Sequence, residues 1–579
     1  MLGSEMAVKM LEKYGVKDVF GLPGDTSLAF YDALCSTDKI NHVLCRDERH
    51  LGYMADAYAR VSDRPGVCEV PSGGGVTYLA PALAEADGSS VPVISLASDV
   101  PLSSDEKNSL TALDQKAVIS SLTRFSHRIT QPNFIPAIFR KGFRMAVSGH
   151  TGPAHLTLPE DVLSGSVSSQ TAETDCYAEE ACKKYPAYRA RANAHWVEKA
   201  CELILEAKRP LIIAGGGVLL SRAWAELKEL SEYLSIPVIT SINGKGSVAE
   251  TSPLALGVMG TNGAKPSSNQ AAGEADVILA IGTRLNSSTC PPSLLHPQAK
   301  IIQADSDPSQ LGNNVKTEVG LHGDAKLILQ DLMLAVKDRC RKSRSPFDWV
   351  IQASQRVETD FSQMKKYLSS TKDKGYMHPV RPIHVLEELL PQDSILVLDA
   401  GYSTPFVAGY FKTKKAGRTF IDPRAQGSLG YALPAAIGVK IAKPDAPVVA
   451  LFGDGSLGMS LGEMETVTRL KLPIIYIHFN NNSFGWIQNL QKIYCSERYF
   501  SSSFDDSVDY VEAARAHGLN GVRAETSTAF HKALSQALHS DQATFIEIPA
   551  PSAKDLTPLV APWIKDEEKP KEERIRKSY

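Results

Sequence analysis

Two apolar runs in the carboxyl-terminal part of the chain each end in a short polar segment, and this arrangement constrains the fold more than any other feature. Residues 448–452 lead into Gly-Asp-Gly-Ser at 453–456, and residues 473–479 lead into Asn-Asn-Asn-Ser at 480–483. Short apolar runs bounded by turn residues are typical of buried strands. Apolar side chains recur at every third position over residues 461–470, which predicts a helix between the two strands. Both polar segments therefore follow the carboxyl ends of strands in a strand, helix, strand unit.

These polar segments offer the hard oxygen ligands that Mg²⁺ prefers. We expect the Asp454 carboxylate, the Asn481 amide oxygen and the backbone carbonyl near Ser483 to bind the ion, together with phosphate oxygens of a ligand. Gly-Asp-Gly alone is also an ordinary turn sequence. The strand context and the asparagine pair favour a metal diphosphate site. Free backbone N–H groups at the start of the helix can bind phosphate, so the expected cofactor-binding residues also include Gly453, Gly455 and Ser456.

The pattern closely resembles the thiamin diphosphate (ThDP) motif of the family that contains acetolactate synthase, pyruvate decarboxylase and benzaldehyde lyase. In that family a glutamate of the N-terminal domain hydrogen-bonds the aminopyrimidine ring of ThDP and helps to activate it. The matching residue is Glu48, because Ala-Asp-Ala-Tyr-Ala-Arg at 55–60 and the flanking segments 20–24 and 72–75 are also similar to the family. The resemblance implies that Glu48 is both catalytic and cofactor-binding. Asp47 is its nearest competitor, and a charged residue on a solvated helix is the alternative.

Two further segments resemble the cofactor site of this family. The resemblance implies that the Gly427 carbonyl holds the pyrimidine amino group and that Leu429 wedges between the two rings of ThDP, which bends the cofactor. A plain core leucine is the alternative for Leu429. The segment that follows the apolar run 395–398 is similar to the first diphosphate-binding loop, and its candidate residues are Gly401, Tyr402 and Ser403.

The length of the chain predicts several domains. A chain of 579 residues is too long for one core and suggests roughly three domains of 100–200 residues. Polar linkers begin near residue 164 and near residue 340. We expect an α/β protein with three doubly wound domains and mainly parallel sheets: a pyrimidine-binding domain at 1–165, a Rossmann-like central domain at 190–338, a diphosphate- and Mg-binding domain at 375–550, and a tail at 551–579.

The sequence of the central domain does not decide whether it binds a nucleotide cofactor. A predicted strand at 210–214 leads into three glycines at 215–217, a Rossmann-like pattern, but the full GxGxxG and a suitable acidic residue are missing. In acetolactate synthases the equivalent domain binds FAD, partly around Arg-Phe-Asp-Asp, and this chain has Arg-Leu-Asn-Ser at 284–287. A structural domain and a retained FAD or ADP site are both compatible with this pattern, although no complete motif supports the second.

Some of the residues that the resemblance places at the substrate match pyruvate decarboxylases, and others match acetolactate synthases. Pyruvate decarboxylases have Pro-Gly-Asp, matched here by Asp25, but also a His-His pair and a later glutamate, which this chain lacks. Acetolactate synthases have a Phe-Gln pair, of which Gln115 matches the glutamine and Asp114 replaces the phenylalanine. Trp486 stands where these synthases have methionine. We expect Asp25, Gln115 and Trp486 to line the substrate cavity, with core packing as the alternative for Trp486.

The resemblance implies an enzyme that acts on 2-oxo acids. We predict ThDP- and Mg²⁺-dependent decarboxylation of a 2-oxo acid, with carboligation of the resulting enamine to a second carbonyl substrate, as in acetolactate synthase. One alternative is a non-oxidative decarboxylase that releases an aldehyde. Another is an inactive cofactor-binding subunit of an assembly. The family also implies a homodimer or homotetramer, since a complete site pairs domains of two chains.

Composition excludes other classes of partner. Lys and Arg number 62 against 65 Asp and Glu, a net charge of −3 without a basic stripe, so we expect no nucleic acid partner. Nine cysteines without a CxxC suggest reduced thiols. No apolar run reaches the roughly 18 residues of a membrane span, so we expect no membrane partner and a cytoplasmic location. The apolar segment 556–563 is expected to cover the active site or to dock on the surface.

Overall fold

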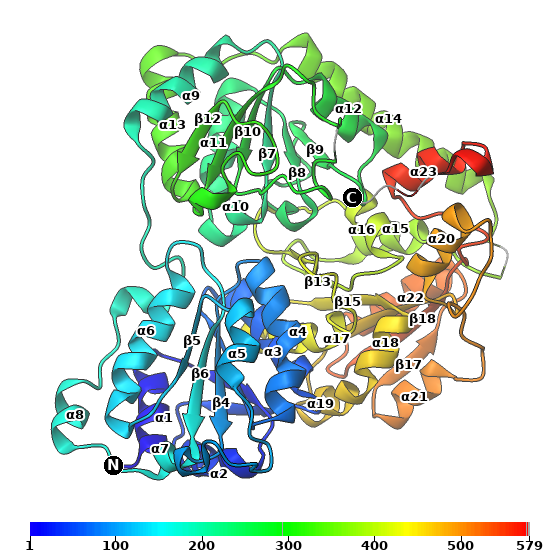
Figure 1. Cartoon of the computed structure of the whole chain (residues 1–579). Helices are drawn as coiled ribbons and strands as arrows, with labels where there is room; N and C mark the ends of the chain where they lie inside the picture. The colour runs from blue at the N-terminus through cyan, green and yellow to red at the C-terminus, as the bar shows by residue number, and fades with distance from the viewer. Residues whose placement is uncertain (292, 374, 575, 577–579) are drawn as a thin grey trace. The chain divides into compact units, whose positions relative to one another are not determined.

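Three six-stranded sheets organise the chain, and every strand pairing in them is parallel. The computed structural model describes residues 1–291, 293–373, 375–574 and 576, so residues 575 and 577–579 of the expected tail lie outside the described part. Helices lie on both faces of the sheets (Figure 1). The predicted fold class, α/β with three doubly wound parallel sheets, is confirmed.

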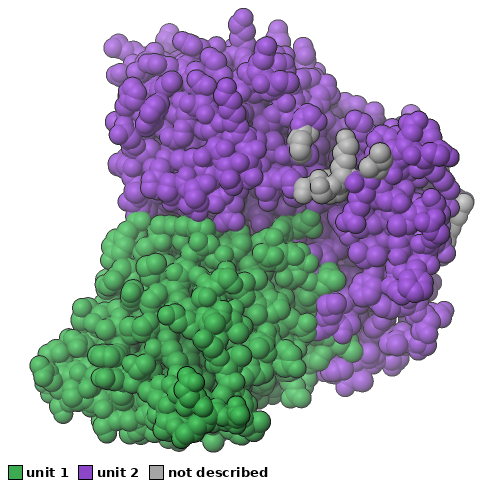
Figure 2. All heavy atoms as spheres, viewed as in Figure 1, with its two compact units in different colours: residues 1–188, 423–445, 460–470 green, residues 189–422, 446–459, 471–579 purple. Residues whose placement is uncertain are grey.

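Packing divides the chain into two compact units that differ from a simple division by sequence. Unit 1 comprises Met1–Tyr188, Pro423–Asp445 and Ser460–Leu470, and unit 2 comprises the remaining segments (Figure 2). Unit 1 holds one sheet and unit 2 holds the other two. Two segments of the carboxyl-terminal part of the chain therefore belong to unit 1.

Unit 1 is built on a sheet of strand order β2-β1-β3-β4-β6-β5. Its strands are β1 (Asp18–Gly21), β2 (Asn41–Leu44), β3 (Gly66–Val70), β4 (Val93–Asp99), β5 (Phe125–Arg128) and β6 (Ala154–Pro159). Its helices are α1 (Gly3–Lys13), α2 (Leu28–Cys35), α3 (Glu48–Ser62), α4 (Gly74–Gly88), α5 (Gln115–Ile119), α6 (Ile135–Val147), α7 (Glu160–Ser164), α8 (Ser169–Thr174), α17 (Ala432–Ala442) and α19 (Met464–Arg469).

The second sheet, in unit 2, confirms the Rossmann-like pattern. Its strands are β7 (Pro210–Ala214), β8 (Val238–Thr240), β9 (Ala255–Val258), β10 (Val277–Ile281), β11 (Lys300–Asp305) and β12 (Val319–His322). The order β9-β8-β7-β10-β11-β12 is the 3-2-1-4-5-6 order of dinucleotide-binding folds. The accompanying helices are α9 (Ala194–Glu206), α10 (Gly216–Ser221), α11 (Trp224–Leu234), α12 (Pro266–Glu274), α13 (Ala325–Arg339) and α14 (Asp348–Ser370).

The third sheet has the order β14-β13-β15-β16-β18-β17, which repeats the connectivity of the first sheet. Its strands are β13 (Ile395–Leu398), β14 (Phe420–Ile421), β15 (Val448–Gly453), β16 (Ile475–Asn480), β17 (Asn520–Arg523) and β18 (Thr544–Pro549). Around it lie α15 (Val380–Leu389), α16 (Thr404–Tyr410), α18 (Asp454–Ser460), α20 (Gly485–Tyr494), α21 (Tyr510–Ala516), α22 (Ser527–Ala537) and α23 (Ala561–Glu567).

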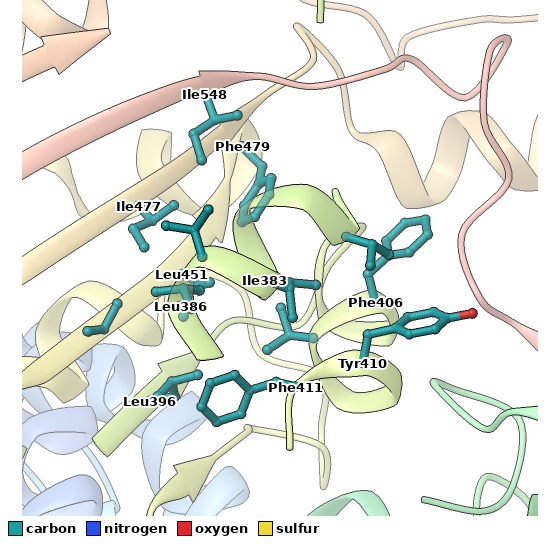
Figure 3. Packing of buried hydrophobic residues seen from close by; sticks show 14 of the residues in the cluster. Ile383, Leu386, Leu396, Phe406, Tyr410, Phe411, Leu451, Ile477, Phe479 and Ile548 are labelled. Carbon is teal, nitrogen blue, oxygen red and sulfur yellow. The ribbon is translucent and has the colours of Figure 1, made fainter. Parts of the chain in front are cut away.

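A continuous apolar core supports one face of this third sheet. Leu451 and Ile477 are paired residues of β15 and β16, and both belong to this core. Figure 3 shows them with Ile383 and Leu386 of α15 and with Phe406 of α16. Strands that are buried on both faces read as unbroken apolar runs, which explains why residues 448–452 and 473–479 lack alternation.

The predicted helix over residues 461–470 is only partly correct. The structure has α18 from Asp454, then a short 3-10 turn at Leu461–Glu463, then α19. Ser460 breaks the helix with φ −132° and ψ 4°. The break falls where the chain leaves unit 2 and enters unit 1, so α18 packs in unit 2 up to Met459, whereas α19 packs in unit 1.

Close packing of α17 against α3 holds unit 1 together. Tyr431 donates a 2.6 Å hydrogen bond to Asp56 Oδ1, and Arg60 Nε pairs with the same oxygen at 2.8 Å. All three side chains are buried. A Cβ on Gly438 would lie 2.1 Å from the Met54 carbonyl oxygen, so the two helices touch through this glycine.

Gly438→Ala should therefore destabilise unit 1. Overpacking of this kind costs about 1–3 kcal/mol, and we expect the thermal unfolding midpoint to fall by several degrees. Gly74→Ala is the matched control, because a Cβ there meets no atom within 4 Å. Equal midpoints for the two variants, measured by scanning calorimetry, would contradict this account of the helix contact.

Candidate active site

Asp454 and Asn481 meet at one edge of the third sheet. β15 pairs with β16 so that Gly453 lies opposite Phe479, and each strand ends at the same edge. Asp454 Oδ2 accepts the backbone N–H of Asn481 at 3.1 Å and that of Ser483 at 3.3 Å. The structure thus brings together all three predicted metal-binding residues.

The side-chain amide of Asn481 lies beside two oxygens of this site. One end of the amide is 2.9 Å from Asp454 Oδ2 and 3.2 Å from the Ser483 carbonyl oxygen, and its nitrogen donates to both atoms when it occupies that end. The amide oxygen can take the same place when a cation is bound. One carboxylate, one amide and one carbonyl oxygen form a hard donor set that fits Mg²⁺. The described residues contain no cluster of three His, Cys, Asp or Glu that could hold a metal.

The other asparagines of the motif shape the turn. Asn480 Oδ1 accepts the backbone N–H of Asn482 at 3.1 Å, and Asn480 Nδ2 donates to Glu547 Oε2 at 3.2 Å. Asn482 has a φ of +51°, a left-handed conformation that asparagine tolerates better than most residues. The turn aims the Asn481 side chain back at Asp454.

The predicted diphosphate loop lies beside this metal site. Tyr402 follows β13, and a Cβ on Gly485 would lie 3.2 Å from Tyr402 Cβ and 2.7 Å from Asn481 Nδ2. Around Gly401, a Cβ would meet no atom within 4 Å, so the backbone there is open to a ligand. The remaining predicted residues take these positions: Ser403 is buried just before α16, Gly453 ends β15, and Gly455 and Ser456 form the first turn of α18.

His478 is a functional candidate that we did not predict. Its Nε2 lies 2.9 Å from Asp454 Oδ1, and its Nδ1 lies 3.6 Å from Glu547 Oε2. Burial would lower the pKa of His478, but the two carboxylates raise it above its usual value. Burial also works against ionised Glu547, yet His478 and Arg523 hold the pKa of that carboxyl below its usual value. A histidine within an otherwise apolar run was the available signal in the sequence.

Glu48 is the first residue of α3 in unit 1. Asp47 caps this helix, because its carboxylate accepts the backbone N–H of Arg49 at 2.8 Å. Glu463, fully buried, accepts from the backbone N–H of Arg46 at 2.9 Å and lies 3.2 Å from His50 Nδ1. These contacts fix the backbone on both sides of Glu48. Burial, with the nearby Asp47 charge, raises the pKa of Glu48 above its usual range.

The loop that carries Gly427 and Leu429 is also part of unit 1. Gly427 has a φ of +67°, which favours glycine. Glu85 accepts the backbone N–H of Gln426 at 2.9 Å and so holds the start of the loop. Leu429 is half-buried and is not a core residue of the described chain, which argues against the plain core alternative.

Asp25 and Gln115 differ in their surroundings. Asp25 is exposed at the start of a 3-10 turn. Gln115 is buried, donates to the Ser98 carbonyl at 2.8 Å and accepts from Thr157 Oγ1 at 3.2 Å. Asp114, which replaces the phenylalanine of acetolactate synthases, caps α5 by accepting from Ala117 N at 3.0 Å. That departure from the family pattern therefore has a local structural role.

Trp486 packs against the carboxyl-terminal segment. Its ring centroid lies 4.4 Å from that of Trp563, which is 1% exposed. Tyr494 of α20 donates a 2.7 Å hydrogen bond to Asp566 of α23. This packing supports the core alternative for Trp486, and its place in a substrate cavity stays a prediction. The described part of the tail docks on α20, and its role as a cover also stays a prediction.

The central glycines are accounted for by contacts inside the protein. A Cβ on Gly215 would lie 2.1 Å from the Gly282 carbonyl oxygen, and one on Gly217 would lie 2.7 Å from Gly282 Cα. Only glycine lets the segment of Gly215 and Gly217 pack this closely against the segment of Gly282. The glycines are therefore not specific evidence for a nucleotide. Among the described residues no helix is both long and apolar enough to cross a membrane.

Comparisons with known proteins match three parts of this chain. Three family models match: the N-terminal TPP binding domain of thiamine pyrophosphate enzymes over residues 1–118, their central domain over 197–332, and their C-terminal TPP binding domain over 399–548. A probable acetolactate synthase large subunit of Methanocaldococcus jannaschii is 34% identical, covering 97% of this chain and 94% of the relative. The corresponding protein of Methanococcus aeolicus is also 34% identical, over 94% of this chain and 91% of its own length.

A more distant bacterial relative gives the same result. The acetolactate synthase isozyme 3 large subunit of Escherichia coli is 29% identical over 96% of each chain. The matches include strands of all three sheets. The family resemblance that the motifs indicated is confirmed. The chain therefore belongs to the thiamin diphosphate-dependent enzymes of the acetolactate synthase family.

Proposed function

We propose that this enzyme decarboxylates a 2-oxo acid and joins the remaining acyl unit to a second carbonyl compound, with ThDP and Mg²⁺ as cofactors. The observation that carries the proposal is the meeting of Asp454, Asn481 and Ser483 at the carboxyl ends of β15 and β16, where Asp454 Oδ2 accepts the backbone N–H groups of the other two residues. The names of its relatives, acetolactate synthase large subunits, support the carboligase assignment. The relatives' names favour a transferase-type carboligase, and the site geometry supports the metal and cofactor part of the proposal.

The residues of the chain divide the work. When bound, ThDP supplies the nucleophilic carbon and the electron sink for decarboxylation. Asp454, Asn481 and the Ser483 carbonyl would hold the metal and through it the diphosphate. The loop of Gly401, Tyr402 and Ser403 would close around the phosphates from the neighbouring strand. Glu48 would hold a proton against a pyrimidine nitrogen, a role that its raised pKa suits.

We place the substrate contacts with Asp25, Gln115 and Trp486, and the pyrimidine contacts with Gly427 and Leu429. We also propose that the protein forms a homodimer or a homotetramer, because in this family a complete site pairs domains of two chains. The relatives are named large subunits, so we include assembly with a second kind of subunit in the proposal.

We propose a cytoplasmic location, with which the nine free cysteines are consistent. For the central domain we propose a structural role, with bound FAD or ADP as the alternative.

Asp454→Ala should abolish ThDP binding in the presence of Mg²⁺, because it removes the one anionic protein ligand. Titration calorimetry with ThDP and Mg²⁺ measures this. Asp393→Ala is the matched control. This exposed aspartate precedes the amino-terminal end of β13, whereas the proposed diphosphate loop follows the carboxyl end of that strand. Unchanged ThDP affinity in Asp454→Ala would exclude the metal assignment.

Glu48→Gln should keep the cofactor and lose roughly a hundredfold in turnover, as expected for a proton-transfer group. Cofactor binding by calorimetry and CO₂ release in single turnovers separate the two effects. Asp47→Asn serves as the control, because asparagine also caps helices well. If Glu48→Gln turned over at the rate of the unmodified enzyme, Glu48 would not be the activating carboxyl.

A panel of 2-oxo acids should give a carboligated product with CO₂ as the second product. We expect hydroxy-keto products, identified by mass spectrometry, in excess of free aldehyde. Aldehyde as the main product would support the decarboxylase alternative, which the exposed Asp25 motivates. Tight ThDP binding without any CO₂ release would instead indicate an inactive subunit.

A further inference from the structure

A single imidazole interrupts the apolar face of the third sheet that lies opposite the core of Figure 3. Ile477 and Phe479 of β16 face that core, so the alternating position, His478, faces the other side. His478 is 0% exposed, and the rings of Phe452, Phe545 and Tyr510 surround it, with centroids 6.1, 5.7 and 5.0 Å away. A buried polar ring among aromatics is unfavourable unless it has polar partners.

Strand register supplies those partners. His478 lies directly opposite Phe452 on β15 and opposite Glu547 on β18. Asp454 follows two positions after Phe452, and its Oδ1 lies 2.9 Å from His478 Nε2. Glu547 Oε2 lies 3.6 Å from His478 Nδ1 on the other side. The imidazole therefore stands between two buried carboxylates of neighbouring strands.

We propose that His478 is a positioning residue that holds the Asp454 carboxylate for the metal. This inference rests on the metal site of the proposed function. His478 binds Oδ1, while the backbone N–H groups of Asn481 and Ser483 bind Oδ2. With both oxygens held, the carboxylate plane is fixed before a cation arrives. Oδ2, which lies 2.9 Å from one end of the Asn481 side-chain amide, is the oxygen presented to the ion.

Glu547 extends the arrangement to the other ligand segment. Its Oε2 also accepts from Asn480 Nδ2 at 3.2 Å, and Asn480 directly precedes the ligand Asn481. Its Oε1 pairs with Arg523 Nε at 2.6 Å. Arg523, Glu547, His478 and Asp454 thus form an unbroken chain of polar contacts from a half-exposed guanidinium to the metal ligand. Groups behind a ligand orient it in this way, and their loss typically weakens metal binding 10–100-fold.

The competing explanation is that His478 only fills its place in the sheet. A purely packing role predicts a loss of stability and no selective effect on the metal. Metal affinity and unfolding midpoint therefore have to be measured on the same variants. The readout is binding of Mg²⁺ in the presence of saturating ThDP, by calorimetry, with Mn²⁺ paramagnetic resonance as a second measurement.

We expect His478→Leu to weaken Mg²⁺ binding about 10–100-fold. His478→Gln, which keeps a hydrogen-bond donor on a side chain of similar length, should recover part of that loss. His155→Leu is the matched control: His155 is also 0% exposed in a parallel sheet, but its partners are the hydroxyls of Ser95 and Thr157. The control should unfold at a lower temperature and keep its Mg²⁺ affinity.

The outcomes separate the inference from the proposed function. If the unmodified protein binds no ThDP with Mg²⁺, the cofactor assignment itself fails. If it binds them and His478→Leu has the same Mg²⁺ affinity, the positioning role is overturned while the metal site stands. Equal losses of metal affinity in His478→Leu and His155→Leu would also overturn it, since the effect would then follow stability. Should His478→Leu not fold, Glu547→Gln must weaken Mg²⁺ binding selectively for the inference to survive.

Discussion

Parallel pairing of β15 with β16 in one fixed register is the constraint on which the rest of the site depends. With Gly453 opposite Phe479, the residue after each strand emerges at the same edge, and the Asp454 carboxylate meets the backbone of Asn481 at 3.1 Å. A slip of one residue would exchange the two faces of β16, moving His478 into the apolar core and Ile477 beneath the carboxylate. The apolar core on one face and the imidazole on the other therefore specify the same register.

Much of this site could be predicted because its signal is local in the sequence. The apolar runs at 448–452 and 473–479, each followed by polar residues, predicted both strands and both ligand segments. The three sheets followed from length and from the family resemblance. The break at Ser460 could not be predicted, because local apolar spacing carries no signal for it. It coincides with the passage of the chain from unit 2 to unit 1.

The missed residues depend on contacts between distant segments. His478 is a functional candidate only because Asp454 and Glu547 lie beside it in the folded sheet. The local spacing of residues does not predict the order of the strands that brings these three together. Glu463 is similar: it looks like a surface helix residue, yet it is fully buried, accepts the backbone N–H of Arg46 and contacts the imidazole of His50.

The composition of unit 1 has a consequence for synthesis of the protein. Its first sheet is complete once residue 159 has been made, but α17 and the segment with Glu463 come from residues 423–445 and 460–470. Domains generally fold in the order in which they leave the ribosome. The side of α3 that packs on α17 therefore stays uncovered until about 250 residues beyond Tyr188 have been made, since α17 ends at Ala442. Unit 1 can therefore reach its full packing only late in synthesis, unlike a domain made of one contiguous segment.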